Sequence, residues 1–305
     1  MKYSNVLIVL SVILLTVAMS FAAESFGTIY EDNNVKNSKY VDASDKALTL
    51  TLEKAKEQMK SENPDVLENS ITGGLVEDDI FGYIWMFTSK NLDGGAVLSG
   101  IDPYNGDTIY VYKELKSRLN IETPTPISSK EANEIANDYL EKKSNIDGTI
   151  FSSVIFHSST GENLPATYAV HYDRVINGIN SLSDGIILNL DAETGEVVSY
   201  RKRWKMPESQ VMKIDTKPSL SEEEIGKILN KHMSSWTPLS KNDDVEIQSM
   251  DLFWIDYNYR ENQVHDIHLI QRVKFIDSIR NEEPIPIAWI DVHSGEVLSV
   301  QYELG

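Results

Sequence analysis

The chain has 305 residues, of which 41% are hydrophobic, and it carries 28 lysines and arginines against 47 aspartates and glutamates. That apolar content is enough for a packed core, so we expect a folded chain rather than an intrinsically disordered one. The lack of cysteine excludes disulfides, cysteine-ligated zinc, iron–sulfur clusters and a thiol nucleophile. The net charge of −19 disfavours nucleic acid as a partner, because binding phosphates requires a basic face.

The N-terminus has the pattern of an export signal. Lys2 precedes an apolar run over residues 6–23, and Ser20 and Ala22 suit the −3 and −1 positions of a signal-peptidase site. Residues 1–23 are therefore expected to be a signal peptide, or else an uncleaved membrane anchor, since eighteen helical residues span about 27 Å. Both alternatives predict a secreted or cell-surface protein, which touches the membrane only if the segment is retained.

A polar stretch follows the leader, and then one short motif occurs three times. Residues 24–42 lack helical or strand periodicity, which indicates a flexible spacer. The repeated motif is an apolar residue, Asp, three variable residues, Gly and an acidic residue, and its leading aspartates are separated by 89 and 100 residues. Its fixed positions are Asp102, Gly106, Asp191, Gly195, Asp291 and Gly295.

Each motif is interpreted as a structural hairpin turn. Apolar residues alternate on both sides of it, Gly supplies a positive φ angle, and the Asp side chain accepts hydrogen bonds from amides two or three residues on. A calcium loop is the functional alternative, but the spacing differs from the twelve-residue EF-hand pattern. We expect no metal site.

A helical pattern precedes each hairpin. Ser128 and Glu131 form a capping box before an apolar face at 132–140, and Ser221 and Glu224 repeat it before 225–229. The first copy is looser, with a helix expected from Ser44 through Met59.

Segments of period two lie between each helix and its hairpin. They include residues 83–87, 168–172, 252–254 and 267–269, and such alternation is typical of half-buried antiparallel strands. The predicted fold class is therefore α+β, with three tandem modules that each pack one helix on an antiparallel sheet ending in a β-hairpin. The expected modules cover residues 43–115, 125–206 and 218–305, the first being degenerate.

The order of helix, strands and closing hairpin resembles the PepSY family of exported modules that occur in peptidase propeptides. The likeness rests on residues 128–136 and 190–198, and on 172–179 with 184–186, which resemble the variant found in tandem-repeat surface proteins. It is good over 127–204, fair over 220–302 and poor for the first module. The resemblance implies a fold and an exported context, a role in inhibiting or assisting peptidases, and no catalytic residues.

A search for chemistry finds few candidates. His265 and His268 are the only closely spaced histidines, and three residues apart on a strand they would face opposite sides. No nucleophile elbow or metalloprotease motif is present, so we expect neither an enzyme nor a cofactor, although the fold could still assemble a carboxylate site.

One basic strip, which contains Arg201, Arg203 and Trp204, departs from the acidic balance. It is either a docking strip for an acidic partner, anchored by the tryptophan, or a strand end whose charges pair with acidic neighbours.

Two functions remain open at this stage. The first is an exported, non-enzymatic interaction protein that inhibits or regulates an extracytoplasmic peptidase, with strand addition at a sheet edge as one mode of contact. The alternative is a cell-envelope binding or structural module with no peptidase link. Partner identity distinguishes the two.

Overall fold

The computed structural model describes residues 40–43, 46–78, 81–114, 126–143, 147–158, 165–236, 245–258, 264–276 and 285–303. The predicted leader at 1–23 and nearly all of the predicted spacer at 24–42 lie outside these ranges. Within the described ranges, no helix has both the length and the apolar character needed to cross a membrane.

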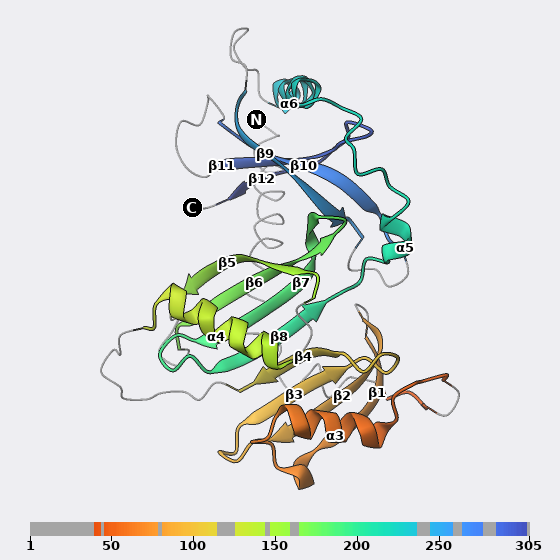
Figure 1. Ribbon diagram of the computed structural model, residues 1–305, viewed down its shortest axis with the longest axis vertical. Coiled ribbons are helices and arrows are strands. Elements are labelled where there is room, and N and C mark those ends of the chain that lie inside the picture. The colour runs from red at the N-terminus through yellow and green to blue at the C-terminus, as the bar shows by residue number, and fades with distance from the viewer. Residues whose placement is uncertain are drawn as a thin grey trace, which may run out of the picture.

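In the described chain, each of three long helices is followed by four strands (Figure 1). The helical segments are α3 (Leu52–Glu62), η1 (Glu68–Ser70), α4 (Ser129–Lys142), α5 (Glu208–Val211) and α6 (Glu222–Trp236). The strands are β1 (Thr72–Asp78), β2 (Gly82–Lys90), β3 (Ala96–Ile101), β4 (Thr108–Lys113), β5 (Thr149–His157), β6 (Thr167–Ile176), β7 (Ile179–Asp191), β8 (Val197–Arg203), β9 (Glu246–Asp256), β10 (Ile267–Ile276), β11 (Ile285–Asp291) and β12 (Val297–Glu303).

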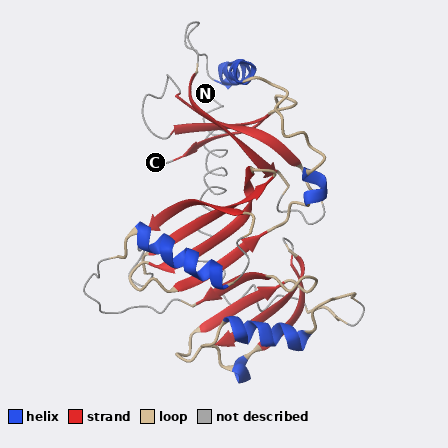
Figure 2. Cartoon of the chain, in the orientation of Figure 1, coloured by secondary structure: helices blue, strands red, loops and turns tan. Residues whose placement is uncertain are grey.

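The fold is a mixed α+β arrangement with one large sheet and few helices in the described chain (Figure 2). All twelve strands belong to that sheet, whose main path runs β1-β2-β3-β4-β8-β7-β9-β10-β11-β12, while β5 and β6 branch from β7. Neighbouring strands are antiparallel except β7 and β9, which are parallel over Asn180 and Ser181. Because the strands form a single sheet, the division into three separate modules stays a prediction.

The three Asp-Gly motifs adopt one and the same turn. In the second, the Asp191 carboxylate accepts the N–H groups of Glu193 and Thr194 at 3.0 and 2.9 Å, and the Gly195 N–H bonds the Asp191 carbonyl at 2.9 Å. Asp102 and Asp291 make the equivalent bonds. The glycines Gly106, Gly195 and Gly295 have φ angles of 79°, 70° and 75°, a region that favours glycine.

The turns also hold the helices in place. The N–H of the residue before each helix N-cap bonds the carbonyl of the residue after the turn aspartate: Leu50 to Pro103 at 2.9 Å, Ile127 to Ala192 at 2.8 Å and Leu220 to Val292 at 3.1 Å. The Ser128 and Ser221 hydroxyls then accept the N–H groups of Glu131 and Glu224, as the capping-box patterns predict.

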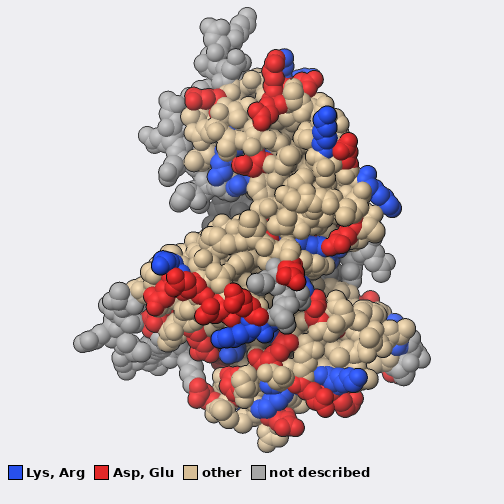
Figure 3. Space-filling model, viewed as in Figure 1, with Lys and Arg blue, Asp and Glu red and all other residues tan. Residues whose placement is uncertain are grey.

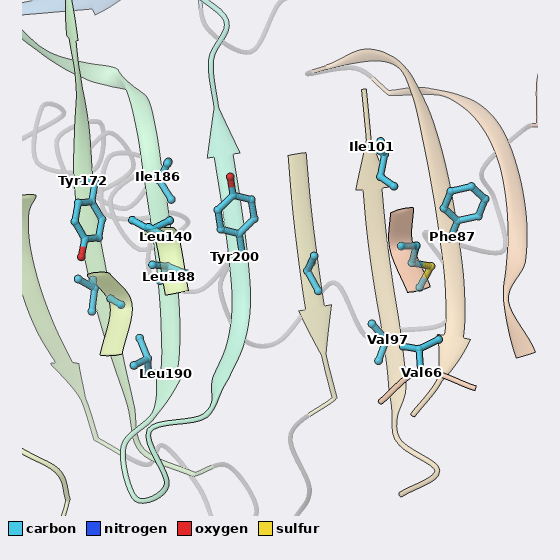
Figure 4. Packing of buried hydrophobic residues seen from close by; sticks show 14 of the residues in the cluster. Val66, Phe87, Val97, Ile101, Leu140, Tyr172, Ile186, Leu188, Leu190 and Tyr200 are labelled. Carbon is cyan, nitrogen blue, oxygen red and sulfur yellow. The ribbon is translucent and has the colours of Figure 1, made fainter. Parts of the chain in front are cut away.

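Helices α3, α4 and α6 pack on the sheet, and the core lies between each of these helices and the strands beneath it. We call α3 with β1–β4 the first helix-and-strand set, α4 with β5–β8 the second, and α6 with β9–β12 the last. The largest cluster of buried side chains is continuous through the first two sets. Figure 4 shows two groups of its residues, with Phe87, Val97 and Ile101 on the first set of strands and Leu188 and Tyr200 on the second. A separate cluster beneath α6 contains Ile225, Leu229, Phe275 and Ile290.

The predicted start of the first helix is wrong. Helix α3 begins at Leu52, with Thr51 as its N-cap, and the described residues 46–50 are not helical. The N–H groups of Thr49 and Leu50 bond the Pro103 carbonyl, so this backbone is committed to the hairpin turn and cannot continue the helix. The apolar residues at 48 and 50 instead pack against the core from a loop.

Replacement of Gly195 tests the contact between turn and helix. A Cβ atom at this position would lie 2.6 Å from Ile135 Cδ1 of α4, in addition to its strained φ angle. Because the Ile135 Cδ1 methyl can shift in part, Gly195→Ala should lower the free energy of unfolding by about 1.5–3 kcal/mol in urea denaturation. Gly178→Ala is the matched control, because Gly178 has φ +75° and no atom within 4 Å, and it should cost only about 1–2 kcal/mol. Equal losses in the two variants would contradict the packing role.

Candidate interaction surface

Strand β5 forms an edge of the sheet. Among the described strands it pairs only with β6, in an antiparallel register from Thr149 opposite Arg174 to His157 opposite Thr167. Its sequence, TIFSSVIFH, contains no lysine, arginine, aspartate or glutamate. An uncharged edge strand of nine residues lacks the charges with which proteins commonly protect such edges from further pairing.

Large apolar side chains of β5 are unusually exposed. Ile150, Phe151, Ile155 and Phe156 are 44–49% exposed. Phe151 and Phe156 lie beside the buried rings of Tyr172 and Tyr168, with ring centroids 6.0 and 5.1 Å apart. The strand therefore offers both backbone hydrogen-bonding groups and apolar surface to a partner.

The two isoleucines lie on the other face of the sheet from these phenylalanines. Ile155 is opposite Ala169 and Ile150 is opposite Asp173 in the β5–β6 register, while Phe156 is opposite Tyr168. Side chains alternate between faces along a strand, so apolar groups are exposed on both sides of the β5 edge. A strand added to β5 would cover part of each face.

Acidic side chains gather over the helix that covers β5 and its neighbours. Helix α4 exposes Glu131, Glu134, Asp138 and Glu141, and Figure 3 shows red side chains concentrated over this helix. Lys130 and Lys142 are exposed on the same helix, so the four carboxylates leave a modest acidic excess, which favours a partner segment with basic residues.

One histidine, His171, lies on β6, the strand next to the β5 edge. His171 pairs with Ser153 of β5 and Ile187 of β7. Burial, together with the charge of Arg201 and the neighbouring His157, lowers the pKa of His171 to about 4. The imidazole is therefore neutral at neutral pH and adds no positive charge to the edge.

The predicted docking strip lies at the end of β8. Arg201 is paired between Tyr110 of β4 and Ile187 of β7, and Arg203 is the last residue of the strand. The ring of Trp204 makes cation–π contacts with two cations of its own chain, Arg174 at 4.5 Å and Lys202 at 5.0 Å from its centroid. Lys202 also forms an ion pair with Asp107 at 2.6 Å. Binding of an outside partner here stays a prediction.

Arg174 belongs to a buried network that the sequence did not reveal. Its guanidinium bonds Asp184 at 2.9 Å and Glu208 at 2.7 Å, and the Arg174 and Asp184 side chains are only 4% and 1% exposed. The Asp184 carboxylate also accepts the N–H groups of Lys205 and Met206. Burial nevertheless raises the pKa of Asp184, a rise that these N–H groups and Arg174 oppose. The network fixes the exit of β8 where the chain turns toward the last set of strands.

The two closely spaced histidines contact different aspartates. His265 lies before β10 with Nδ1 2.7 Å from Asp256, whereas His268 lies within β10 with Nδ1 2.8 Å from Asp291. The described ranges contain no group of three or more His, Cys, Asp or Glu residues that could hold a metal ion. The turn aspartates, including Asp191 and Asp291, bond backbone amides as described above.

Sequence reasoning missed the β5 edge, although a signal for it was present. The run from Thr149 to His157 is rich in β-branched and aromatic residues, which favours a strand. Nothing in it indicates that one side would remain unpaired, because that depends on which strand lies next to it in space.

No family model matches the chain, and no curated protein matches it. Among solved structures, the C-terminal domain of Bacillus megaterium YpeB has a similar fold, with a TM-score of 0.51 and 14% identity, over 84% of this chain and 99% of that one. This domain is PepSY-related, and at that identity the likeness shows the fold alone. A "putative lipoprotein" from Clostridium difficile 630 aligns over 62% of this chain and all of its own, with 13% identity and a TM-score of only 0.20.

Removal of the buried cation tests the network around Asp184. Arg174→Gln leaves a carboxylate that is 1% exposed without its charged partner, so the free energy of unfolding should fall by about 3–5 kcal/mol. Lys130→Gln is the matched control, since its pair with Glu134 is exposed, and it should cost less than about 0.5 kcal/mol. Urea denaturation of both variants gives the comparison, and a small loss for Arg174→Gln would show that the network is dispensable.

Proposed function

We propose that this protein is an exported, non-enzymatic interaction protein built from three PepSY-like modules, and that it binds an extended segment of a partner protein along β5. The observation that carries the proposal is the uncharged edge of β5, where four large apolar side chains are 44–49% exposed. An extended peptide added to such an edge gains backbone hydrogen bonds and apolar contacts together.

The charge of the molecule bears on the kind of partner. A second copy of the chain would bring another net charge of −19, and its α4 would carry the same excess of exposed acidic over basic groups. A different protein with basic residues flanking an apolar strand is the better match, because opposite charges favour association. Self-association through β5 is therefore the weaker possibility.

The proposed partner is an extracytoplasmic peptidase whose activity the protein restrains. Two observations support this part of the proposal: the sequence resemblance to PepSY modules of peptidase propeptides, and the fold likeness to the PepSY-related YpeB domain. A cell-envelope component with no peptidase link remains the alternative, and the experiment below separates the two.

Partner capture tests the proposed function. The full chain is immobilised and exposed to an exported-protein fraction from its native source, and peptidase activity is titrated in the same samples. Enrichment of a peptidase whose activity falls in proportion to the added protein supports the proposal. Enrichment of envelope components with unchanged proteolysis would establish the alternative.

Charged substitutions on β5 test the binding edge itself. In the double variant Ile150→Lys with Ile155→Lys, two exposed apolar groups become cations that a partner strand would have to desolvate, so binding should weaken by roughly tenfold to a hundredfold. Leu92→Lys is the control, because Leu92 is 72% exposed in the β2–β3 turn, away from β5. The affinity for the captured partner is measured by calorimetry. If both proteins bind as well as the unsubstituted chain, β5 is not the contact.

A further inference from the structure

A pocket lies beneath the start of α6 in the last helix-and-strand set. Its volume is about 320 Å³, which is at the lower end of ligand-binding pockets. Its wall combines apolar side chains with acidic ones and one amide. The lining residues are Pro218, Leu220, Glu222, Ile225, Met250, Asp251, Leu252, Gln271 and Val292.

The strand register shows what occupies this place in the other two sets. The residue just before each turn aspartate pairs with Trp85 in the first set, Tyr168 in the second and Gln271 in the third. The aromatic rings of Trp85 and Tyr168 both belong to the core beneath the helices. Gln271 therefore stands where the other two sets have a large ring.

Both aromatic side chains make the same hydrogen bond. Trp85 Nε1 donates to the Leu50 carbonyl at 2.9 Å, and Tyr168 Oη donates to the Ile127 carbonyl at 2.7 Å. Each acceptor is the residue immediately before the helix N-cap. The equivalent carbonyl in the last set belongs to Leu220, which lines the pocket.

The other residues that differ between the last set and the first two do not fill the space of the missing aromatic ring. Ile225 adds some volume where the other helices have Ala55 and Ala132, yet the pocket remains. The Gln271 residue is 8% exposed, and it forms part of the pocket wall. The last set thus has the space that an aromatic side chain fills in the other sets, with the buried Gln271 in its wall, but it has no ring there.

We propose that this pocket binds an aromatic ring that carries a hydrogen-bond donor, a phenol or an indole, in the position that Tyr168 and Trp85 fill in the other sets. Donation to the Leu220 carbonyl would replace the bond that the missing side chain makes. The acidic Glu222 and Asp251 in the wall select a ring attached to a neutral or cationic group over one attached to a carboxylate. This inference is independent of the β5 edge and of the proposed peptidase partner.

The ligand could be a free aromatic amine or a tyrosine or tryptophan side chain of a peptide, and four small probes distinguish these sources. Tyramine represents the amine and N-acetyl-tyrosinamide the peptide, while phenethylamine lacks the phenol oxygen and N-acetyl-tyrosine carries a carboxylate. Binding to the full chain is measured by ligand-observed NMR with titration. We expect tyramine or the amide to bind, phenethylamine to bind about tenfold more weakly than tyramine, and N-acetyl-tyrosine to bind more weakly than the amide.

Variants that fill the pocket complete the test. Gln271→Tyr restores the ring of the second set, and Leu252→Phe copies Phe156, which pairs with Tyr168 as Leu252 pairs with Gln271. Each should abolish probe binding while the thermal midpoint is retained or raised. Lys231→Tyr is the control, because it adds a ring on the exposed side of α6 and should leave binding unchanged.

Two results would overturn the proposal. One is the absence of saturable binding of both tyramine and the amide at millimolar concentration. The other is unchanged binding in either pocket-filling variant that retains the thermal midpoint of the parent chain. With two independent substitutions, misfolding of one does not remove the test.

Discussion

The hydrogen bond between each turn and the chain entering its helix is the constraint on which the rest of the structure depends. It joins Leu50 to Pro103, Ile127 to Ala192 and Leu220 to Val292, pairs that are far apart in sequence. The turn aspartate orients that carbonyl by bonding the amides that follow it. Since this contact determines where each helix begins, it also determines which helix face meets the sheet and which side chains form the core.

How the strand sets join determines which surface is left for binding. The first two sets meet through β4 and β8, whereas the last set joins through β7, and Trp254 Nε1 donates to the Ile176 carbonyl at that joint. The buried pair of Arg174 and Asp184 lies close by and fixes the connecting chain. Because β9 pairs with β7 rather than with β5, the apolar strand β5 stays at an edge of the sheet. The proposed binding surface results from this strand pairing.

The three helix-and-strand sets share one backbone arrangement but carry different side chains at equivalent positions. The contact between helix and turn is made by Ile135 against Gly195 and by Ile228 against Gly295, but by a hydrogen bond from the Gln58 amide to the Gly106 carbonyl in the first set. The core position under the helix start is Trp85, Tyr168 or Gln271. Backbone hydrogen bonds maintain the geometry in every set, so the side chains are free to differ, and the last set gains a pocket as a result.

The sequence by itself determined the local features: the three turns, the capped starts of α4 and α6 and the alternating strands, because each depends on residues only a few positions apart. It did not determine where α3 begins, since Leu50 is bound by a turn more than fifty residues away. Only the tertiary structure decided that β5 is an edge, that Arg174 is buried against Asp184 and that Gln271 faces a pocket. Strand partners and the filling of space between distant segments are set by long-range packing, which leaves no periodic signal in the chain.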